Sequence, residues 1–169
     1  MMKHNIPIFL IFLIAFISLI AACDKEDTVQ PDPYVSIETD LMCNSEFGSK
    51  TDEPGPGQSC VWWEYDGDST LLLQHFNAGF NCCPEEILLS LDFIGDTIVV
   101  TERDSMQLCR CNCLYNLDIT VHHVKPKKYV VQMLEPFVKD PKSPLIFNID
   151  LVNQKSGKVC DDRDYYPWH

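Results

Sequence analysis

The stretch from Cys109 to Val121 constrains the fold most, because its side chains alternate between apolar and polar along the chain. Apolar side chains stand at every second position: Cys109, Cys111, Cys113, Tyr115, Leu117, Ile119 and Val121. The positions between them are polar except Leu114. A period of two is typical of a half-buried β-strand. We therefore predict a strand over residues 108–124 that points three sulfur atoms into the core.

Short runs of this kind recur through the chain and predict an all-β protein. We expect about eight to ten strands, separated by turn residues. The segments are 34–41, 60–65, 70–81, 87–93, 97–103, 108–124, 129–134, 145–152 and 159–160. The clearest pair is the hairpin of 87–93 and 97–103, and residues 129–134 are expected to run back along 108–124. The pattern predicts an antiparallel β-sandwich, Ig-like or jelly-roll-like, as a single domain over residues 34–169.

The N-terminus reads as a targeting segment rather than as part of the fold. An apolar run over residues 6–22 ends in Ile20-Ala21-Ala22-Cys23. This ending resembles the lipobox of bacterial lipoproteins, a family in which the signal peptide, here residues 1–22, is cut before a cysteine that is then acylated. The resemblance implies lipidation of Cys23, with palmitate-type acyl chains. The alternative is an ordinary secretory signal with a chance cysteine at the cut.

Residues 23–33 are expected to form the lipidated cysteine and a flexible tether, since they are polar and contain two prolines. The charged run after Cys23, Asp24-Lys25-Glu26-Asp27, resembles the surface-export signal of Bacteroides-type lipoproteins. That resemblance implies the outer face of the outer membrane. A solvated tether would explain the same charges and would leave the leaflet open.

The acidic balance of the chain limits its partners. The full sequence has 13 Lys and Arg against 25 Asp and Glu, a formal charge of −12. Loss of Lys3 with the signal makes the mature chain one unit more negative. Such a surface repels nucleic acid and anionic headgroups. We therefore expect membrane attachment through acyl chains on Cys23 and no nucleic-acid partner.

Eight cysteines remain beyond Cys23, and an even number in an exported small domain favours disulfides. The candidates are Cys43, Cys60, Cys82, Cys83, Cys109, Cys111, Cys113 and Cys160. Neighbours at i and i+2 on one strand face are too far apart to bridge each other. The simplest framework pairs Cys82 and Cys83 with two of the triple at 109, 111 and 113. The third would then pair with Cys160, and Cys43 with Cys60.

Metal binding is the alternative use of the same sulfurs. Thiolates and imidazole suit zinc or cuprous copper, and the candidate ligands are His75, Cys82, Cys83, Cys109, Cys111 and Cys113. Two observations count against it: His75 and Cys82 fall on opposite parities of one strand, and free thiols outside the cell oxidise. We therefore expect no cofactor, with zinc or copper as the alternative.

Aromatic residues suggest another possible function of the protein. Two short segments supply six rings: Trp62, Trp63, Tyr65, Tyr165, Tyr166 and Trp168. An exposed platform of rings would stack on sugars, which would make the protein a small carbohydrate-binding domain. Packing explains the same pattern, because one member of each adjacent pair would face the core.

No assembled active site can be recognised in the sequence. The chain lacks a Gly-x-Ser-x-Gly elbow, a His-Glu-x-x-His pair and a glycine-rich phosphate loop. We therefore predict a protein that is not an enzyme.

Three further motifs resemble uncharacterised cysteine-rich lipoproteins of the same bacterial group. They are Phe80-Asn-Cys-Cys-Pro84, Cys109-x-Cys-x-Cys-Leu-Tyr-x-Leu-Asp118 and Tyr166-Pro-Trp168. The resemblance implies the domain boundaries and no activity. The function expected from all these features is that of a surface-anchored accessory or binding module of the cell envelope, with an outer-membrane protein or a glycan as partner.

Overall fold

A computed structural model describes residues 31–39, 41–44, 53–105, 109–138 and 144–164. The predictions about the signal peptide, Cys23 and most of the tether lie outside these residues. Those about Tyr165, Tyr166 and Trp168 lie outside them as well. No helix long and apolar enough to cross a membrane occurs among the described residues.

The described part of the chain contains nine strands, in agreement with the alternation in the sequence. They are β1 (Tyr34–Glu38), β2 (Gln58–Tyr65), β3 (Thr70–Asn81), β4 (Ile87–Ile94), β5 (Thr97–Asp104), β6 (Asn112–His122), β7 (Lys128–Leu134), β8 (Leu145–Asp150) and β9 (Ser156–Asp162). The predicted hairpin is present as β4 and β5, which pair from Ile87 with Asp104 to Ile94 with Thr97. Its turn is Gly95-Asp96, where Gly95 has a φ of 62° that glycine adopts without strain.

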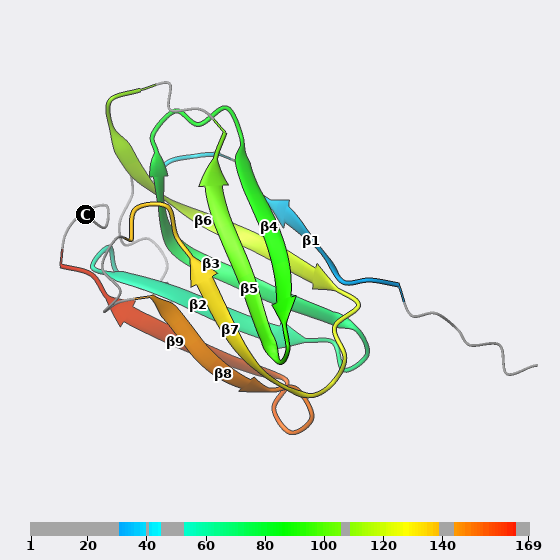
Figure 1. The fold of residues 1–169 in the computed structure, drawn as a ribbon. Helices are drawn as coiled ribbons and strands as arrows, with labels where there is room; N and C mark the ends of the chain where they lie inside the picture. The colour runs from blue at the N-terminus through cyan, green and yellow to red at the C-terminus, as the bar shows by residue number, and fades with distance from the viewer. Residues whose placement is uncertain (1–30, 40, 45–52, 106–108, 139–143, 165–169) are drawn as a thin grey trace, which may run out of the picture. The chain divides into compact units, whose positions relative to one another are not determined.

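The strands form two sheets, which Figure 1 shows packed face to face. One sheet has the order β1-β6-β3-β2-β9 and the other β4-β5-β7-β8. Inward side chains of both sheets make up one apolar core, including Leu73 and Ile119 from the first sheet and Ile98, Val131 and Ile149 from the second. The predicted all-β sandwich is confirmed.

Strand β7 does not lie where the sequence analysis put it. It was expected to run back along the 108–124 strand, but it belongs to the other sheet and pairs with β5, in parallel, and with β8. The chain passes from one sheet to the other between β6 and β7. Because β7 then runs parallel to β5, the second sheet is mixed rather than purely antiparallel. A local pattern of alternation contains no information on which sheet a strand joins.

A β-bulge in β3 reverses which side chains face the core. Leu71, Leu73 and His75 point inward before the bulge, and Ala78 and Phe80 point inward after it. The pairing with β6 passes from His75–Leu117 to Ala78–Tyr115, so two residues of β3 oppose one of β6. Within the bulge Asn77 has a φ of 61°, a conformation that asparagine tolerates better than most residues. His75 is thus the last inward residue before the change of face.

Candidate functional site

A groove of about 760 Å³ lies on the outer face of the five-stranded sheet. The strand registers align five of its lining side chains across all five strands: Lys158, Trp62, Gln74, Asp118 and Glu38. We call this line the outer row. A second line runs beside it in the same groove: Ser156, Glu64, Leu72 and Thr120. Both lines arise because every second residue of a strand faces away from the core.

Trp62 is the aromatic residue of the outer row and is partly exposed. The centroids of the Trp62 and Phe76 rings are 4.6 Å apart, and the two ring planes are inclined at 52°. The Nζ atom of Lys158 is 5.9 Å from the centre of the Trp62 ring. Trp62 is therefore held in place from the side while part of its surface remains open to the groove.

The aromatic platform proposed from the sequence is wrong for two of its members. Trp63 and Tyr65 are core residues with 6% and 2% exposure, and the Tyr65 hydroxyl donates to the Val124 carbonyl at 3.0 Å. Trp62 and Trp63 are neighbours in one strand and so point to opposite faces.

The polar members of the outer row are mainly acceptors. Gln74 donates through Nε2 to Asp118 Oδ1 at 2.8 Å, and Glu38 stands directly opposite Asp118 on β1. Like charges directly opposite each other in a sheet are destabilising. With Glu64, the groove contains three carboxylates and one cation, Lys158. The groove is therefore acidic and rich in hydrogen-bonding groups.

A second cluster is buried between the sheets around His75. Its Nδ1 lies 2.7 Å from Glu102 Oε1 on β5, and its Nε2 lies 2.9 Å from Ser59 Oγ on β2. The Ser59 hydroxyl donates to Glu135 Oε1 at 3.0 Å, just after β7. Arg163, just after β9, donates to the other oxygen of Glu135. Two carboxylates and two basic side chains thus meet between the sheets: Glu102, Glu135, His75 and Arg163.

The electrostatics of this cluster favour a charged imidazole. Burial alone would lower the pKa of His75, but the charge and hydrogen bond of Glu102, with those of Glu135, raise it to about 10. Burial likewise opposes ionisation of Glu135, yet His75 and Arg163 hold its pKa below the usual value. For Glu102 burial prevails over His75 and raises the pKa. The His75–Glu102 pair therefore retains a proton at pH values where the two separate groups would have lost it.

The order Ser59, His75, Glu102 has the distances of a nucleophilic triad, but its surroundings do not suit that chemistry. The exposures are 0%, 0% and 1%, respectively. A base for serine must be a neutral imidazole that accepts the hydroxyl proton. Here the imidazole holds its proton and the Ser59 hydroxyl points to Glu135. We interpret the cluster as a polar connection between the sheets.

This cluster was not predicted from the sequence, although the sequence contains a signal for it. Glu102 shares the inward parity of Ile98 and Val100 on β5, and His75 shares that of Leu71 and Leu73 on β3. A carboxylate and an imidazole on the apolar faces of two strands predict a buried pair. Ser59, Glu135 and Arg163 offered no comparable signal, because they lie near strand ends.

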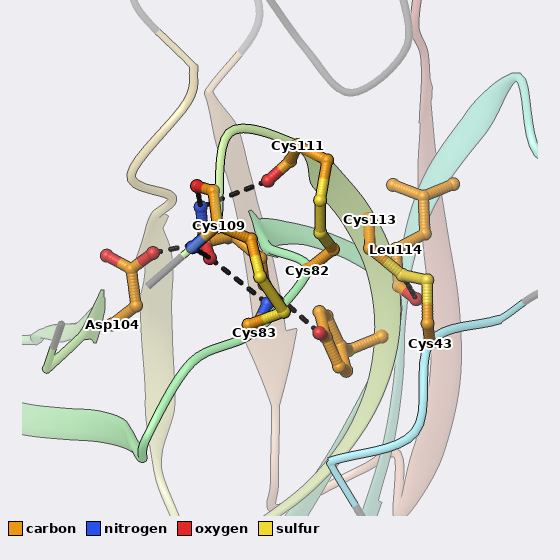
Figure 2. The surroundings of a disulfide bond; sticks show 10 residues. Cys43, Cys82, Cys83, Asp104, Cys109, Cys111, Cys113 and Leu114 are labelled. Atoms are coloured by element: carbon orange, nitrogen blue, oxygen red, sulfur yellow. Dashed lines mark hydrogen bonds between the residues drawn. A yellow bond between two sulfur atoms is a disulfide. The ribbon is translucent and has the colours of Figure 1, made fainter. Parts of the chain in front are cut away.

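All eight candidate cysteines are joined in pairs, and two of the predicted pairings are found. Cys82 pairs with Cys111 and Cys83 with Cys109, side by side at one corner of the sandwich (Figure 2). Cys82 and Cys83 can both bond to cysteines of the same segment because all four residues lie outside the strands: β3 ends at Asn81 and β6 begins at Asn112. Their side chains therefore need not alternate between the two faces of a strand.

The other predicted pairings are wrong. Cys113 pairs with Cys43, as Figure 2 shows, and Cys60 pairs with Cys160. Cys60 and Cys160 are directly opposed on β2 and β9, with Cα atoms 4.0 Å apart. The prediction of three sulfurs in the core also fails for two of them. Cys113 is fully buried, whereas Cys109 is half-buried and Cys111 exposed, because both precede the strand.

Asn81 organises the corner that holds the Cys82–Cys111 and Cys83–Cys109 bridges. Its amide nitrogen donates to the carbonyls of Cys109 and Cys111, at 2.6 and 3.0 Å. Its amide oxygen accepts from the backbone N–H groups of Cys83 and Cys109, at 3.0 and 3.3 Å. One buried side chain thus satisfies four backbone groups of two loops. The Asn-Cys-Cys sequence did not reveal this role.

The structure does not bring the proposed metal ligands together as one set. His75 lies in the buried cluster with Glu102, and Cys113 is bonded to Cys43. The sulfurs of Cys82, Cys109 and Cys111 do lie within 4.8 Å of one another. Each of them belongs to a disulfide, and a thiolate ligand requires a free, deprotonated sulfur.

The chain was compared with known proteins by family model, by sequence and by structure. No family model, curated protein or solved structure matches it.

Proposed function

We propose that this protein is a non-enzymatic binding module of the bacterial cell envelope, anchored to the outer membrane by acyl chains on Cys23 and exposed at the cell surface. Its binding surface is the groove on the outer face of the five-stranded sheet. The observation that carries the proposal is the outer row, which presents a partly exposed tryptophan and four polar side chains in one line.

The remaining features support a rigid module rather than a catalyst. Four disulfides join distant parts of the chain, which suits an oxidising location outside the cytoplasm. The Ser59–His75–Glu102 arrangement is closed to solvent. The outer row, by contrast, is open, and its side chains stand on paired strands, which hold a binding surface more precisely than loops do.

The anchoring part of the proposal is tested with Cys23→Ser in the full-length chain. We expect metabolic labelling with a fatty acid to mark the wild type and not the variant, and the variant to leave the membrane fraction. Protease added to whole cells should remove the wild-type domain if it is surface-exposed. Persistent labelling of the variant would refute acylation at Cys23.

The binding part is tested on cells that display the full-length protein. Cells are exposed to fractionated polymers of the surrounding medium, and retention is compared between wild type, Gln74→Ala and Ile146→Ala. Gln74 lies in the groove, whereas Ile146 is 50% exposed on the second sheet and serves as the control. We expect retention to depend on Gln74 and not on Ile146. If no retained fraction depends on the groove, the groove is not the binding surface.

A further inference from the structure

We infer that the ligand of the groove is an uncharged saccharide chain that lies along the outer row, across the strands. This inference rests on the proposed function and adds the chemical class and direction of the ligand.

The shape of the outer row suits an extended chain. Neighbouring strands in a sheet lie about 4.8 Å apart, so the five positions from Lys158 to Glu38 extend over about 19 Å. All five side chains line the same groove. A single small molecule would use only part of that length, whereas a short run of sugar rings would use all of it.

Trp62 provides the surface on which a sugar ring packs. A pyranose has a face of C–H groups that is complementary to an aromatic ring, while its hydroxyls project sideways. The Phe76 ring, whose centroid lies 4.6 Å from that of Trp62, limits the orientations open to the Trp62 ring before any ligand arrives. Little side-chain freedom is therefore lost on binding, which favours affinity.

The polar neighbours of Trp62 match the hydroxyls that project from such a ring. Asp118 already accepts from Gln74 at 2.8 Å, but a carboxylate has about four acceptor sites, so capacity remains. Glu38 is directly opposite Asp118. Hydroxyl donors placed between these two carboxylates would relieve the repulsion that the sheet otherwise tolerates.

Charge decides against an acidic ligand. Glu38, Glu64 and Asp118 outnumber Lys158 in the groove, so uronic acids, sulfated sugars and phosphate-bearing polymers are repelled.

The arrangement of apolar surface in the groove suits a saccharide better than a protein. Leu72, at 43% exposure, is the one lining residue among the exposed large hydrophobics of the described part of the chain. Protein partners usually bury a continuous apolar centre with a polar rim, whereas here Trp62 and Leu72 stand among charged and hydroxyl side chains.

The inference is tested by affinity electrophoresis of the full-length protein in mild detergent. The gels contain a linear neutral glucan, mannan or xylan, or an acidic polygalacturonate. We expect at least one neutral polymer to retard the wild type, with affinity reduced about tenfold or more in Trp62→Ala and Gln74→Ala. Trp62→Phe should keep part of the affinity, and Ile146→Ala all of it. An unchanged disulfide map and melting temperature show that each variant is folded.

Absence of retardation by every neutral polymer, or stronger binding to polygalacturonate, overturns the inference. The cell-retention experiment separates this failure from failure of the proposed function. A Gln74-dependent ligand that resists periodate and is destroyed by protease would preserve the groove as a binding surface and exclude the saccharide. Retention that is independent of Gln74 would exclude the groove itself.

Discussion

His75 and Glu102 connect the two sheets of the sandwich through the 2.7 Å contact between Nδ1 and Oε1, with both side chains fully buried. The pKa of His75 rises to about 10 and that of Glu102 is also raised. Folding therefore takes up a proton at neutral pH. By linkage, an increase in pH lowers the stability of the fold over the range in which the folded state binds more protons than the unfolded state.

We predict a loss of stability on the alkaline side. The usual pKa of His75 is 6.5 and the folded value is about 10, so its contribution is complete below pH 6.5 and disappears as the pH rises through 10. On the acid side, the lowered pKa of Glu135 contributes stability that is present above pH 4.5. This contribution is lost as the pH falls through the pKa of Glu135 in the folded protein. Urea unfolding over this range should show a decrease of about 2–5 kcal/mol on the alkaline limb.

Glu102→Gln is the matched control for that pH dependence. It keeps the shape of the side chain and removes the charge, so the alkaline limb should flatten. The variant itself should lose about 3–5 kcal/mol at neutral pH, because it breaks a buried ion pair. A wild-type curve that is flat from pH 6.5 to 10 would contradict the assignment of a charged His75.

The disulfide connectivity predicts how a nicked chain behaves. A specific protease site inserted within residues 45–52 would separate Cys43 from Cys60, yet the Cys43–Cys113 bridge should hold both fragments together under non-reducing denaturing conditions. Cys113→Ala should release the N-terminal fragment, and Cys160→Ala should not. The opposite pairing, Cys43 with Cys60, would hold the fragments together in the Cys113→Ala variant, so electrophoresis without reductant separates the two connectivities.

The proximity of three sulfurs at the corner predicts disulfide exchange. In Cys111→Ala the freed Cys82 thiol would lie near the Cys83–Cys109 bridge, since the sulfurs of Cys82 and Cys109 are within 4.8 Å. Attack of the Cys82 thiolate on the Cys109 sulfur would form a Cys82–Cys109 bond and release the Cys83 thiolate. Peptide mapping after alkylation should show both pairings.

The double variant Cys82→Ala/Cys111→Ala removes the attacking thiol and serves as its control. It should retain Cys83–Cys109 alone at the corner and lose about 2–5 kcal/mol of stability.

Chelators should leave the wild-type melting temperature unchanged. Stoichiometric zinc or copper in native protein, with alkylation of these cysteines after chelation and denaturation, would instead support the metal hypothesis.

The packing of Trp63 against β9 predicts a position that accepts no side chain. A Cβ atom at Gly157 would lie 2.8 Å from three atoms of the Trp63 ring, which is 6% exposed in the core. Gly157→Ala should therefore cost about 1–3 kcal/mol, measured by urea unfolding. Gly55→Ala is the control, because nothing lies within 4 Å of its added Cβ. Equal effects of the two substitutions would show that Trp63 can move aside.

Much of the architecture could be predicted from the sequence, because it depends on neighbours along the chain. Alternation between apolar and polar residues predicted nine segments that are strands, and the turn at Gly95-Asp96 set the β4–β5 pairing. The proximity of Cys82 and Cys83 to the 109–113 triple was predicted as well. The opposite faces of Trp62 and Trp63 follow from adjacency in one strand.

The tertiary structure decided the features that depend on contacts between distant segments. The assignment of β7 to the second sheet, the partners of Cys43 and Cys60, and the outer row all require a register between strands far apart in the sequence. The bulge at Asn77 changed the face of half of β3, which no period of two can anticipate. The alternation of a strand specifies two faces, but only pairing and packing determine which face is covered and which residues align across the sheet.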